Sequence, residues 1–125
     1  MNKALILFAH GARDPEWARP VQAVAQRLQA ENPDLPVTIA FLEFMSPALP
    51  DAIDLIARQT TGAVPLQIDI LPFFIAQGGH LRQEVPTMLA EIRQQHPQLQ
   101  IRLLPPLGEL PSVQDAIAQA ITQLL

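Results

Sequence analysis

Residues 5–15 read LILFAHGARDP and change character halfway along. The first five are apolar, as expected for a strand that is buried on both faces of a parallel sheet. His10 and Gly11 end the run, and Asp14 followed by Pro15 is a start signal for a helix. The Asp side chain can accept an otherwise unpaired amide hydrogen bond, and proline loses nothing at the first helical position. The stretch therefore predicts a strand, a turn that carries a histidine, and a helix.

The remainder of the chain repeats this alternation of apolar runs with longer segments of helical spacing. Four strands are expected, over residues 3–9, 36–42, 66–73 and 100–104. Strands that alternate with helices are typical of a parallel sheet with helices on both faces. The predicted fold class is α/β, a three-layer flavodoxin-like domain with a four-stranded parallel sheet flanked by helices.

Proline and glycine residues help to locate the four expected helices. The first helix should run from Asp14 to Asn32-Pro33, and the second from Ser46-Pro47 to Thr61-Gly62. The third helix should carry Pro86 in an early turn. The fourth should begin near Pro111-Ser112. The fourth helix is expected to bury a stripe formed by Val113, Ile117, Ala120, Ile121 and Leu124. His96, at the predicted end of the third helix, is interpreted as structural. Five large apolar residues are expected to serve the core first: Trp17, Met45, Phe73, Phe74 and Met88.

Length and composition limit the possible functions. The chain has 125 residues, of which 49% are hydrophobic and 16% charged, so we expect one domain over residues 1–125. Without cysteine, any metal must be held by His, carboxylate or water. The net charge of −4 argues against a nucleic-acid partner. No run is long enough for a membrane span or a secretory signal, so we expect no membrane partner and a cytoplasmic location.

Polar residues stand where three of the predicted strands end. His10 follows the first strand, Glu43 the second and His80 the third. Ligands of open parallel sheets bind outside the carboxyl ends of the strands, so these side chains can converge on one crevice. Two imidazoles and a carboxylate suit divalent cobalt, nickel, iron or zinc, and imidazole can also accept protons near neutral pH. Each residue taken alone has a plainer interpretation, as part of an ordinary turn or as a solvated side chain.

Cationic and glycine residues surround these three side chains. Arg13 and Arg82 flank the two histidines and can bind carboxylates or phosphates, although a single arginine in such a position is more often solvated surface charge. Glycines stand at 11, 78 and 79, where a turn or a ligand can use their freedom. The chain lacks the glycine-rich dinucleotide fingerprint, the Walker A sequence and the nucleophile elbow of serine hydrolases. Dinucleotide binding, nucleotide hydrolysis and serine hydrolysis are therefore disfavoured.

Four stretches together resemble a known family. They are AHGARDP at 9–15, FLEFMSPALPDAI at 41–53, LPFFIAQGGHLRQEVP at 71–86 and PPLGELP at 105–111. In this order they are similar to the small class II chelatases of tetrapyrrole biosynthesis, the sirohydrochlorin and precorrin chelatases. This sequence has Ala12 where the family usually has serine, and Glu84-Val85-Pro86 where it has an acidic residue, isoleucine and proline.

The resemblance implies a chelatase-like domain that inserts a divalent metal into a sirohydrochlorin-type tetrapyrrole without ATP. The metal would be cobalt, or else iron or nickel, as a substrate and not as a permanently bound cofactor, in cobalamin or siroheme biosynthesis. Carried over by position, His10 and His80 would be catalytic and would bind the metal with Glu43. Arg13, Arg82, Gly11, Gly78 and Gly79 would contact the tetrapyrrole. Because longer members contain two such domains, a one-domain chain is expected to form a homodimer.

Two other functions remain open at this point. The same scaffold could carry a metal or a tetrapyrrole without turnover, since a fold does not fix a function. A flavodoxin-like binder of flavin phosphate is disfavoured because the first strand is not followed by a loop rich in Ser and Thr.

Overall fold

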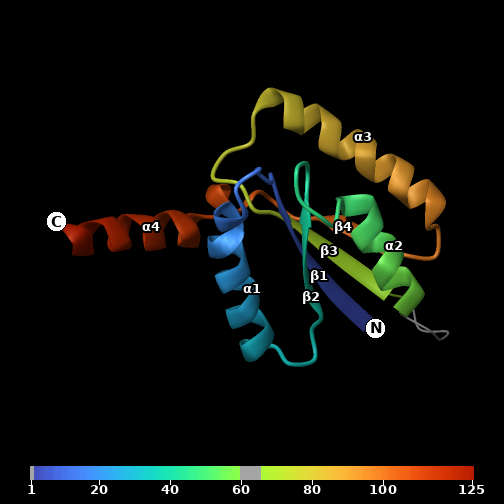
Figure 1. Cartoon of the computed structure of the whole chain (residues 1–125), viewed down its shortest axis with the longest axis horizontal. Coiled ribbons are helices and arrows are strands. Elements are labelled where there is room, and N and C mark those ends of the chain that lie inside the picture. Colours follow the sequence, from blue (N-terminus) through green and yellow to red (C-terminus); the bar gives the residue numbers. More distant parts are fainter. Residues whose placement is uncertain (1, 60–65) are drawn as a thin grey trace.

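The chain folds around one parallel sheet with a reversal of strand order at its centre. The computed structural model describes residues 2–59 and 66–125, and Figure 1 shows the whole chain. Its strands are β1 (Asn2–Ala9), β2 (Val37–Phe41), β3 (Leu66–Pro72) and β4 (Gln100–Leu103), in the order β2-β1-β3-β4. All three pairings are parallel, and every expected strand is confirmed to within two residues at each end. The order reverses between β1 and β3, where ligands of such sheets bind.

Helices cover both faces of the sheet, which confirms the predicted three-layer α/β fold. Helix α1 (Arg19–Glu31) packs through Val21 on a cluster of apolar side chains from β1 and β2. Helices α2 (Leu49–Gln59) and α3 (Gly79–Gln95) cover the opposite face. Their core residues contact side chains from all four strands: Leu49, Ala52, Ile53 and Ile56 of α2, and Val85, Leu89 and Ile92 of α3. No helix within the described residues is long and apolar enough to cross a bilayer.

Helix α4 (Pro111–Leu124) departs from the prediction. The stripe expected to be buried is not: Val113 is half-buried, whereas Ile117, Ala120, Ile121 and Leu124 are exposed. Figure 1 shows why, because α4 leaves the body of the molecule as a projecting arm instead of returning to the sheet. The apolar spacing was a sound indication of a helix, but it carries no information about which surface covers that helix.

Three helix starts also differ from the prediction. Asp14 caps the short 3-10 helix η1 (Pro15–Ala18) by accepting from the Glu16 amide at 3.0 Å, and α1 begins only at Arg19. Helix α2 begins at Leu49 and not at Ser46, because the Phe41 amide donates to the Pro47 carbonyl and Ala48 bridges to Phe41. Helix α3 begins at Gly79, so Pro86 lies in its interior and not in an early turn. The predicted end of the second helix at Thr61-Gly62 lies outside the described residues.

Most of the expected core residues take that role. Phe74 and Met88 belong to the cluster under α2 and α3, and Met45 and Phe73 to the cluster under α1. Trp17 does not, because it lies in η1 with 42% of its surface exposed. His96 is structural, as predicted: it caps the end of α3, and its Nε2 lies 2.5 Å from Asp54 Oδ1 on α2.

A buried carboxylate ties the three strands β1, β3 and β4 together. Asp69 of β3 is 2% exposed and lies opposite Arg102 of β4 in the strand register. The Arg102 guanidinium donates to both carboxylate oxygens, at 3.0 and 2.8 Å, and Lys3 Nζ lies 2.9 Å away. Gln67 also donates, at 2.8 Å. Burial alone would raise the pKa of Asp69, but the bonds from Arg102, Gln67 and Lys3 outweigh it and hold that pKa well below its usual range.

Asp69→Asn should therefore destabilise the protein in a pH-dependent way. We expect the free energy of unfolding at neutral pH to fall by about 1–3 kcal/mol, because Arg102 and Lys3 lose their carboxylate but are partly solvated. A carboxyl with a lowered pKa stabilises the fold above its unfolded pKa of about 3.9 and loses that effect as the pH falls. The difference from the parent should then shrink below about pH 4. Urea denaturation followed by circular dichroism measures it, with Asp34→Asn as an exposed control; a difference that is constant with pH contradicts the assignment.

Candidate functional site

Two of the predicted site residues meet where β1 and β2 end. His10 Nε2 lies 3.0 Å from Glu43 Oε1, and both side chains are about half exposed, at 47% and 48%. The backbone joins the same two segments, since the Leu42 amide donates to the Ala9 carbonyl at 2.9 Å and the Glu43 amide to the His10 carbonyl at 3.1 Å. The pairing of β1 with β2 thus continues past the strands and sets the two side chains beside each other.

Gly11 makes this close approach possible. It is buried and adopts a φ of +94°, a backbone conformation that favours glycine. A Cβ atom at this position would lie 1.9 Å from the Glu43 carbonyl oxygen. The predicted importance of Gly11 thus has a steric reason in the structure, which is the contact between the two loops. Its predicted contact with a substrate is a separate matter and stays a prediction.

Phe44 is a site residue that the sequence analysis did not identify. It follows Glu43 in a left-handed backbone conformation with φ of 66°, and the Met45 amide donates to the Glu43 carbonyl at 2.8 Å across this turn. The ring is 58% exposed, and the Arg13 guanidinium lies 5.0 Å from its centroid, in cation–π geometry. The available signal in the sequence was a large apolar residue between a predicted strand and the next helix. That signal does not show whether the ring is exposed, because the exposure depends on the conformation of the turn.

The segment that follows β3 contacts another side of the His10 ring, and the segment that follows β4 is bonded to it. The Phe74 ring lies edge-on to His10, with 6.5 Å between the ring centroids, and makes a similar contact with Phe8. Gly108, in the short helix η2 (Leu107–Glu109), donates from its amide to the Phe74 carbonyl at 2.9 Å. A Cβ on Gly108 would lie 1.8 Å from the Ile75 carbonyl oxygen, and Ile75 itself is 70% exposed. His10 therefore has an aromatic side and a carboxylate side.

The remaining predicted residues lie at the start of α3. Gly78 caps the helix, Gly79 is its first residue, and the Arg82 amide donates to the Gly78 carbonyl at 3.1 Å. A Cβ atom on either glycine would meet nothing within 4 Å, so these two glycines border open space. The Arg82 side chain is exposed. His80 is the second residue of α3, and its side chain lies outside the described part of the structure.

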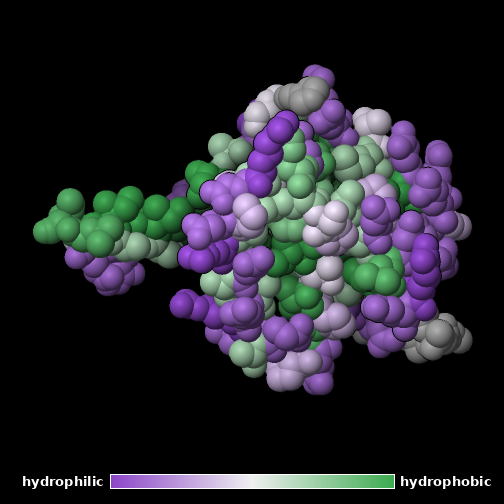
Figure 2. All heavy atoms as spheres, viewed as in Figure 1, coloured by the Kyte–Doolittle hydropathy of each residue, from purple (hydrophilic) through white to green (hydrophobic). Residues whose placement is uncertain are grey.

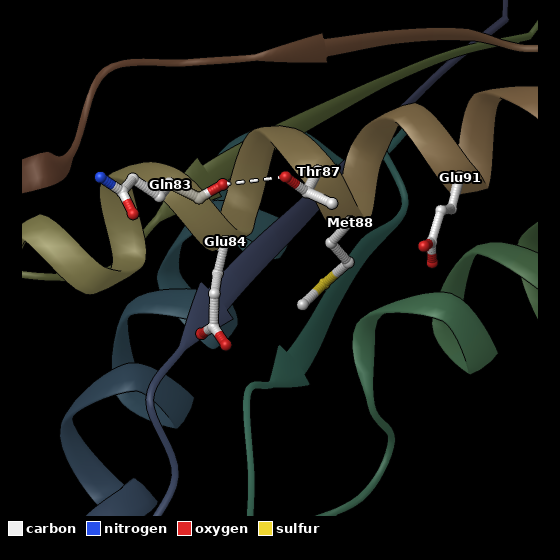
Figure 3. Close-up of a pocket in the computed structure, with 5 residues that line it drawn as sticks. All are labelled: Gln83, Glu84, Thr87, Met88 and Glu91. Carbon is white, nitrogen blue, oxygen red and sulfur yellow. Dashed lines mark hydrogen bonds between the residues drawn. The ribbon is translucent and has the colours of Figure 1, made fainter.

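A hollow of about 400 Å³ runs along α3 beyond position 80. Its lining residues are Gln83, Glu84, Thr87, Met88 and Glu91, and Figure 3 shows the side chains of Glu84, Met88 and Glu91 leaving the same side of the helix. The Thr87 hydroxyl donates to the Gln83 carbonyl at 3.1 Å. Two carboxylates make the hollow unfavourable for an anionic group. An acidic ligand would be better placed near Arg13 and Arg82.

The contacting side chains of His10 and Glu43 have the chemistry for metal binding and for proton transfer. An imidazole nitrogen can bind a transition metal or accept a proton, and a carboxylate can bind the same ion or stabilise an imidazolium. Within the described part of the chain, no group of three His, Asp or Glu side chains could hold a metal ion. The predicted set of His10, His80 and Glu43 therefore stays a prediction, in which the structure places two members in contact.

Comparisons with known proteins show which family and which relatives this chain resembles. Residues 4–124 match the family model CbiX. A sirohydrochlorin cobaltochelatase from Methanococcus aeolicus is 33% identical over 90 residues, which cover 72% of this chain and 60% of that protein. A sirohydrochlorin ferrochelatase from Priestia megaterium is 25% identical over 121 residues, which cover 96% of this chain and 44% of that protein. The chain thus spans between two fifths and two thirds of the length of these relatives.

A solved structure extends the comparison to the fold. The crystal structure of a CbiX protein from Marinobacter aquaeolei matches with a TM-score of 0.82 and 28% identity. The match covers 97% of this chain and 95% of that one, so a chain of nearly the same length adopts this architecture.

The contact at Gly11 predicts a difference between two glycine substitutions. Gly11→Ala should lower the free energy of unfolding by about 2 kcal/mol or more, because it combines a positive φ with a clash against backbone. Gly79→Ala should be neutral or slightly stabilising, since its Cβ meets open space at the start of a helix. Thermal denaturation of the two variants and the parent makes the comparison. Equal stabilities for the two variants would show that the strand ends are not held as described.

Proposed function

The chain belongs to the CbiX family, and on that premise we propose that it inserts a divalent metal ion into a sirohydrochlorin-type tetrapyrrole, without ATP. The observation that carries this proposal is the 3.0 Å contact between His10 and Glu43 at the carboxyl end of the sheet. It supplies a metal ligand and a base side by side, which are the two functions that this reaction requires. The names of the relatives support the choice of reaction and of substrate.

His10 is proposed to act as both ligand and base. When a divalent ion enters the macrocycle, it binds the four ring nitrogens, the two pyrrolic N–H bonds break, and two protons leave. An imidazole nitrogen can hold the incoming ion as water ligands depart, and after the ion has moved on it can take up one of these protons. The half-exposed position of His10 lets solvent carry the proton away.

Glu43 is proposed to support His10 in both steps. Its carboxylate lies within reach of an ion held by His10, and it stabilises the imidazolium that forms when His10 takes a proton. His80 is the proposed second histidine of the site and takes the other proton. This assignment is supported by the position of His80 at the start of α3, next to the open space bordered by Gly78 and Gly79.

Phe44 and the two arginines are proposed to hold the macrocycle. The exposed ring of Phe44 can stack on a flat tetrapyrrole, and Arg13 lies against that ring, where it can pair with a carboxylate arm of the substrate. Arg82 is proposed to meet another arm. These local cations would offset the net charge of −4, which by itself repels a polycarboxylate.

Cobalt is the proposed metal, with iron and nickel as alternatives, and the product would serve cobalamin or siroheme biosynthesis. The relatives include both a cobaltochelatase and a ferrochelatase, and His with Glu accepts all three ions. Initial rates with Co²⁺, Fe²⁺ and Ni²⁺ under anaerobic conditions rank them. Binding of one equivalent without further turnover would indicate a carrier instead. The cytoplasmic location and the homodimer stay predictions.

Substitutions in the contacting pair test the proposed roles. With sirohydrochlorin and Co²⁺, we expect His10→Ala to lower kcat at least about 100-fold, because a ligand and a base are lost together. Glu43→Gln should lower it about 10-fold, because the His10 ring keeps a hydrogen-bond partner but loses the charge. The time-dependent absorbance change of the macrocycle measures the rate. His96→Gln, at a structural histidine, serves as the control. Unchanged rates in both site variants, or a parent rate equal to the uncatalysed background, would exclude the proposal.

Phe44→Ala tests the proposed stacking surface. We expect KM for the tetrapyrrole to rise about 10-fold with little change in kcat, because the ring contributes binding without taking part in proton or metal transfer. Leu55→Ala removes another exposed apolar side chain, on α2, and should leave both parameters unchanged. A fall in kcat at constant KM would instead place Phe44 in the chemical step.

A further inference from the structure

The contact with Glu43 by itself holds the His10 ring only weakly. Both side chains are about half exposed, and water competes for a polar contact between exposed groups, so such a contact contributes little. The structure gives the imidazole a second contact on another side: the Phe74 ring lies edge-on to it, with 6.5 Å between the ring centroids and 71° between the ring planes. What keeps Phe74 in place therefore bears on the direction of His10 Nε2.

The protein core supports Phe74 on the side away from solvent. Only 8% of its surface is exposed, and it belongs to the apolar cluster under α2 and α3. Its ring meets the ring of Phe8, a fully buried residue of β1, edge to face at 6.1 Å, an arrangement that aromatic pairs favour. The backbone agrees with this packing, because the Phe73 amide donates to the Phe8 carbonyl at 2.7 Å. His10 therefore contacts a side chain that the core holds in place.

Gly108, in the segment after β4, holds the same residue from another direction. Its amide donates to the Phe74 carbonyl at 2.9 Å. Its α-carbon lies so close to the next residue that an added Cβ would be 1.8 Å from the Ile75 carbonyl oxygen and 2.5 Å from the Ile75 α-carbon. Gly108 does not have a positive φ, so the reason for glycine here is this contact and not the backbone conformation. Any side chain at position 108 would push against the backbone next to Phe74.

The segment that contains Gly108 is itself fixed at both of its polar backbone groups. It stands where helix α4 leaves the body of the molecule (Figure 1), and Figure 2 shows that arm standing clear of the body, with hydrophobic residues along it. The Gln114 side chain, in the first turn of α4, donates to the Gly108 carbonyl at 3.1 Å. The Gly108 amide is bonded to Phe74 and its carbonyl to α4, so a bonded segment and not a loose loop supports Phe74.

We propose that Gly108 and Phe74 are positioning residues for His10. Gly108 fixes the backbone at Phe74, the Phe74 ring limits the rotation of the imidazole, and His10 Nε2 stays directed toward Glu43 and toward an ion between them. When an ion separates His10 from Glu43, the aromatic contact remains and the imidazole keeps its direction. Groups that orient a ligand in this way raise its affinity for the ion. The consequence for metal insertion rests on the proposed function, whereas the orientation of His10 is measurable without it.

Nuclear magnetic resonance at a fixed pH is the first test, and it needs no activity. The chain has three histidines, so the ring protons of His10 are identified by their absence in His10→Ala. In the parent we expect nuclear Overhauser effects between the His10 and Phe74 rings. Gly108→Ala should remove them, whereas Asp69→Asn, which also destabilises the fold but lies in the interior of β3, should keep them. A folded parent without these effects, or a folded Gly108→Ala variant that retains them, overturns the proposal.

Phe74→Leu is the second test and remains decisive if Gly108→Ala fails to fold. It keeps an apolar side chain in the core but removes the ring that meets His10. We expect the affinity for Co²⁺ alone, measured by titration calorimetry, to fall about 10-fold, the size typical of groups that orient a metal ligand. With sirohydrochlorin, kcat should fall by a similar factor at constant KM, because the buried Phe74 acts through His10.

Phe41→Leu is the matched control, since it makes the same change in the other apolar cluster, under α1, and should leave the Co²⁺ affinity and kcat unchanged. A folded Phe74→Leu variant with the affinity and kcat of the parent, or an equal loss in Phe41→Leu, contradicts the positioning role. A parent that shows the contact between the His10 and Phe74 rings but inserts no metal refutes the proposed function and still supports the placement of His10.

Discussion

The candidate site depends on the close passage of two backbone segments, at Gly11 and Glu43. Gly11 has no side chain and a left-handed φ, so its α-carbon can lie against the Glu43 carbonyl. This passage brings the His10 and Glu43 side chains to 3.0 Å although 33 residues separate them in the chain. It also sets the following turn, in which Phe44 takes its own left-handed conformation and exposes its ring. The contact between His10 and Glu43 and the exposed ring of Phe44 therefore share one steric cause.

The sequence predicts the part of the structure that local patterns determine. The strands of a buried parallel sheet are rich in apolar residues, and the apolar runs that begin at residues 3, 36, 66 and 100 predicted all four strands to within two residues at each end. The convergence of His10 and Glu43 was predictable as well, since residues that follow neighbouring parallel strands lie at one edge of the sheet. Helix starts were less accurate. Helix α2 begins later than predicted because the Phe41 amide donates to the Pro47 carbonyl, and the local sequence does not indicate this contact.

Features that depend on contacts between distant segments could not be predicted. The spacing of Ile117, Ile121 and Leu124 indicates a helix with one apolar side, and it would do so equally whether that side met its own sheet or another molecule. Trp17 was misjudged, and Phe44 was not identified, for a related reason. Hydrophobic residues are usually assigned to the core, and only the backbone path shows that these two are exposed, Phe44 against Arg13 and Trp17 at the hollow that Phe73 also lines.

The exposure of the His10 and Glu43 pair fits a site that passes an ion on instead of keeping it. A contact between two half-exposed groups contributes little to stability, about 1 kcal/mol or less, so the pair can separate when an ion or a macrocycle arrives. A closed set of buried ligands would bind a divalent ion tightly and release it slowly. The buried cluster around Asp69 shows the contrast: there, several donors saturate the carboxylate, and its bonds hold strands together. Asp69, buried within β3, thus holds the fold, whereas Glu43, exposed in the loop after β2, is free of that task and suits the proposed exchange of ligands.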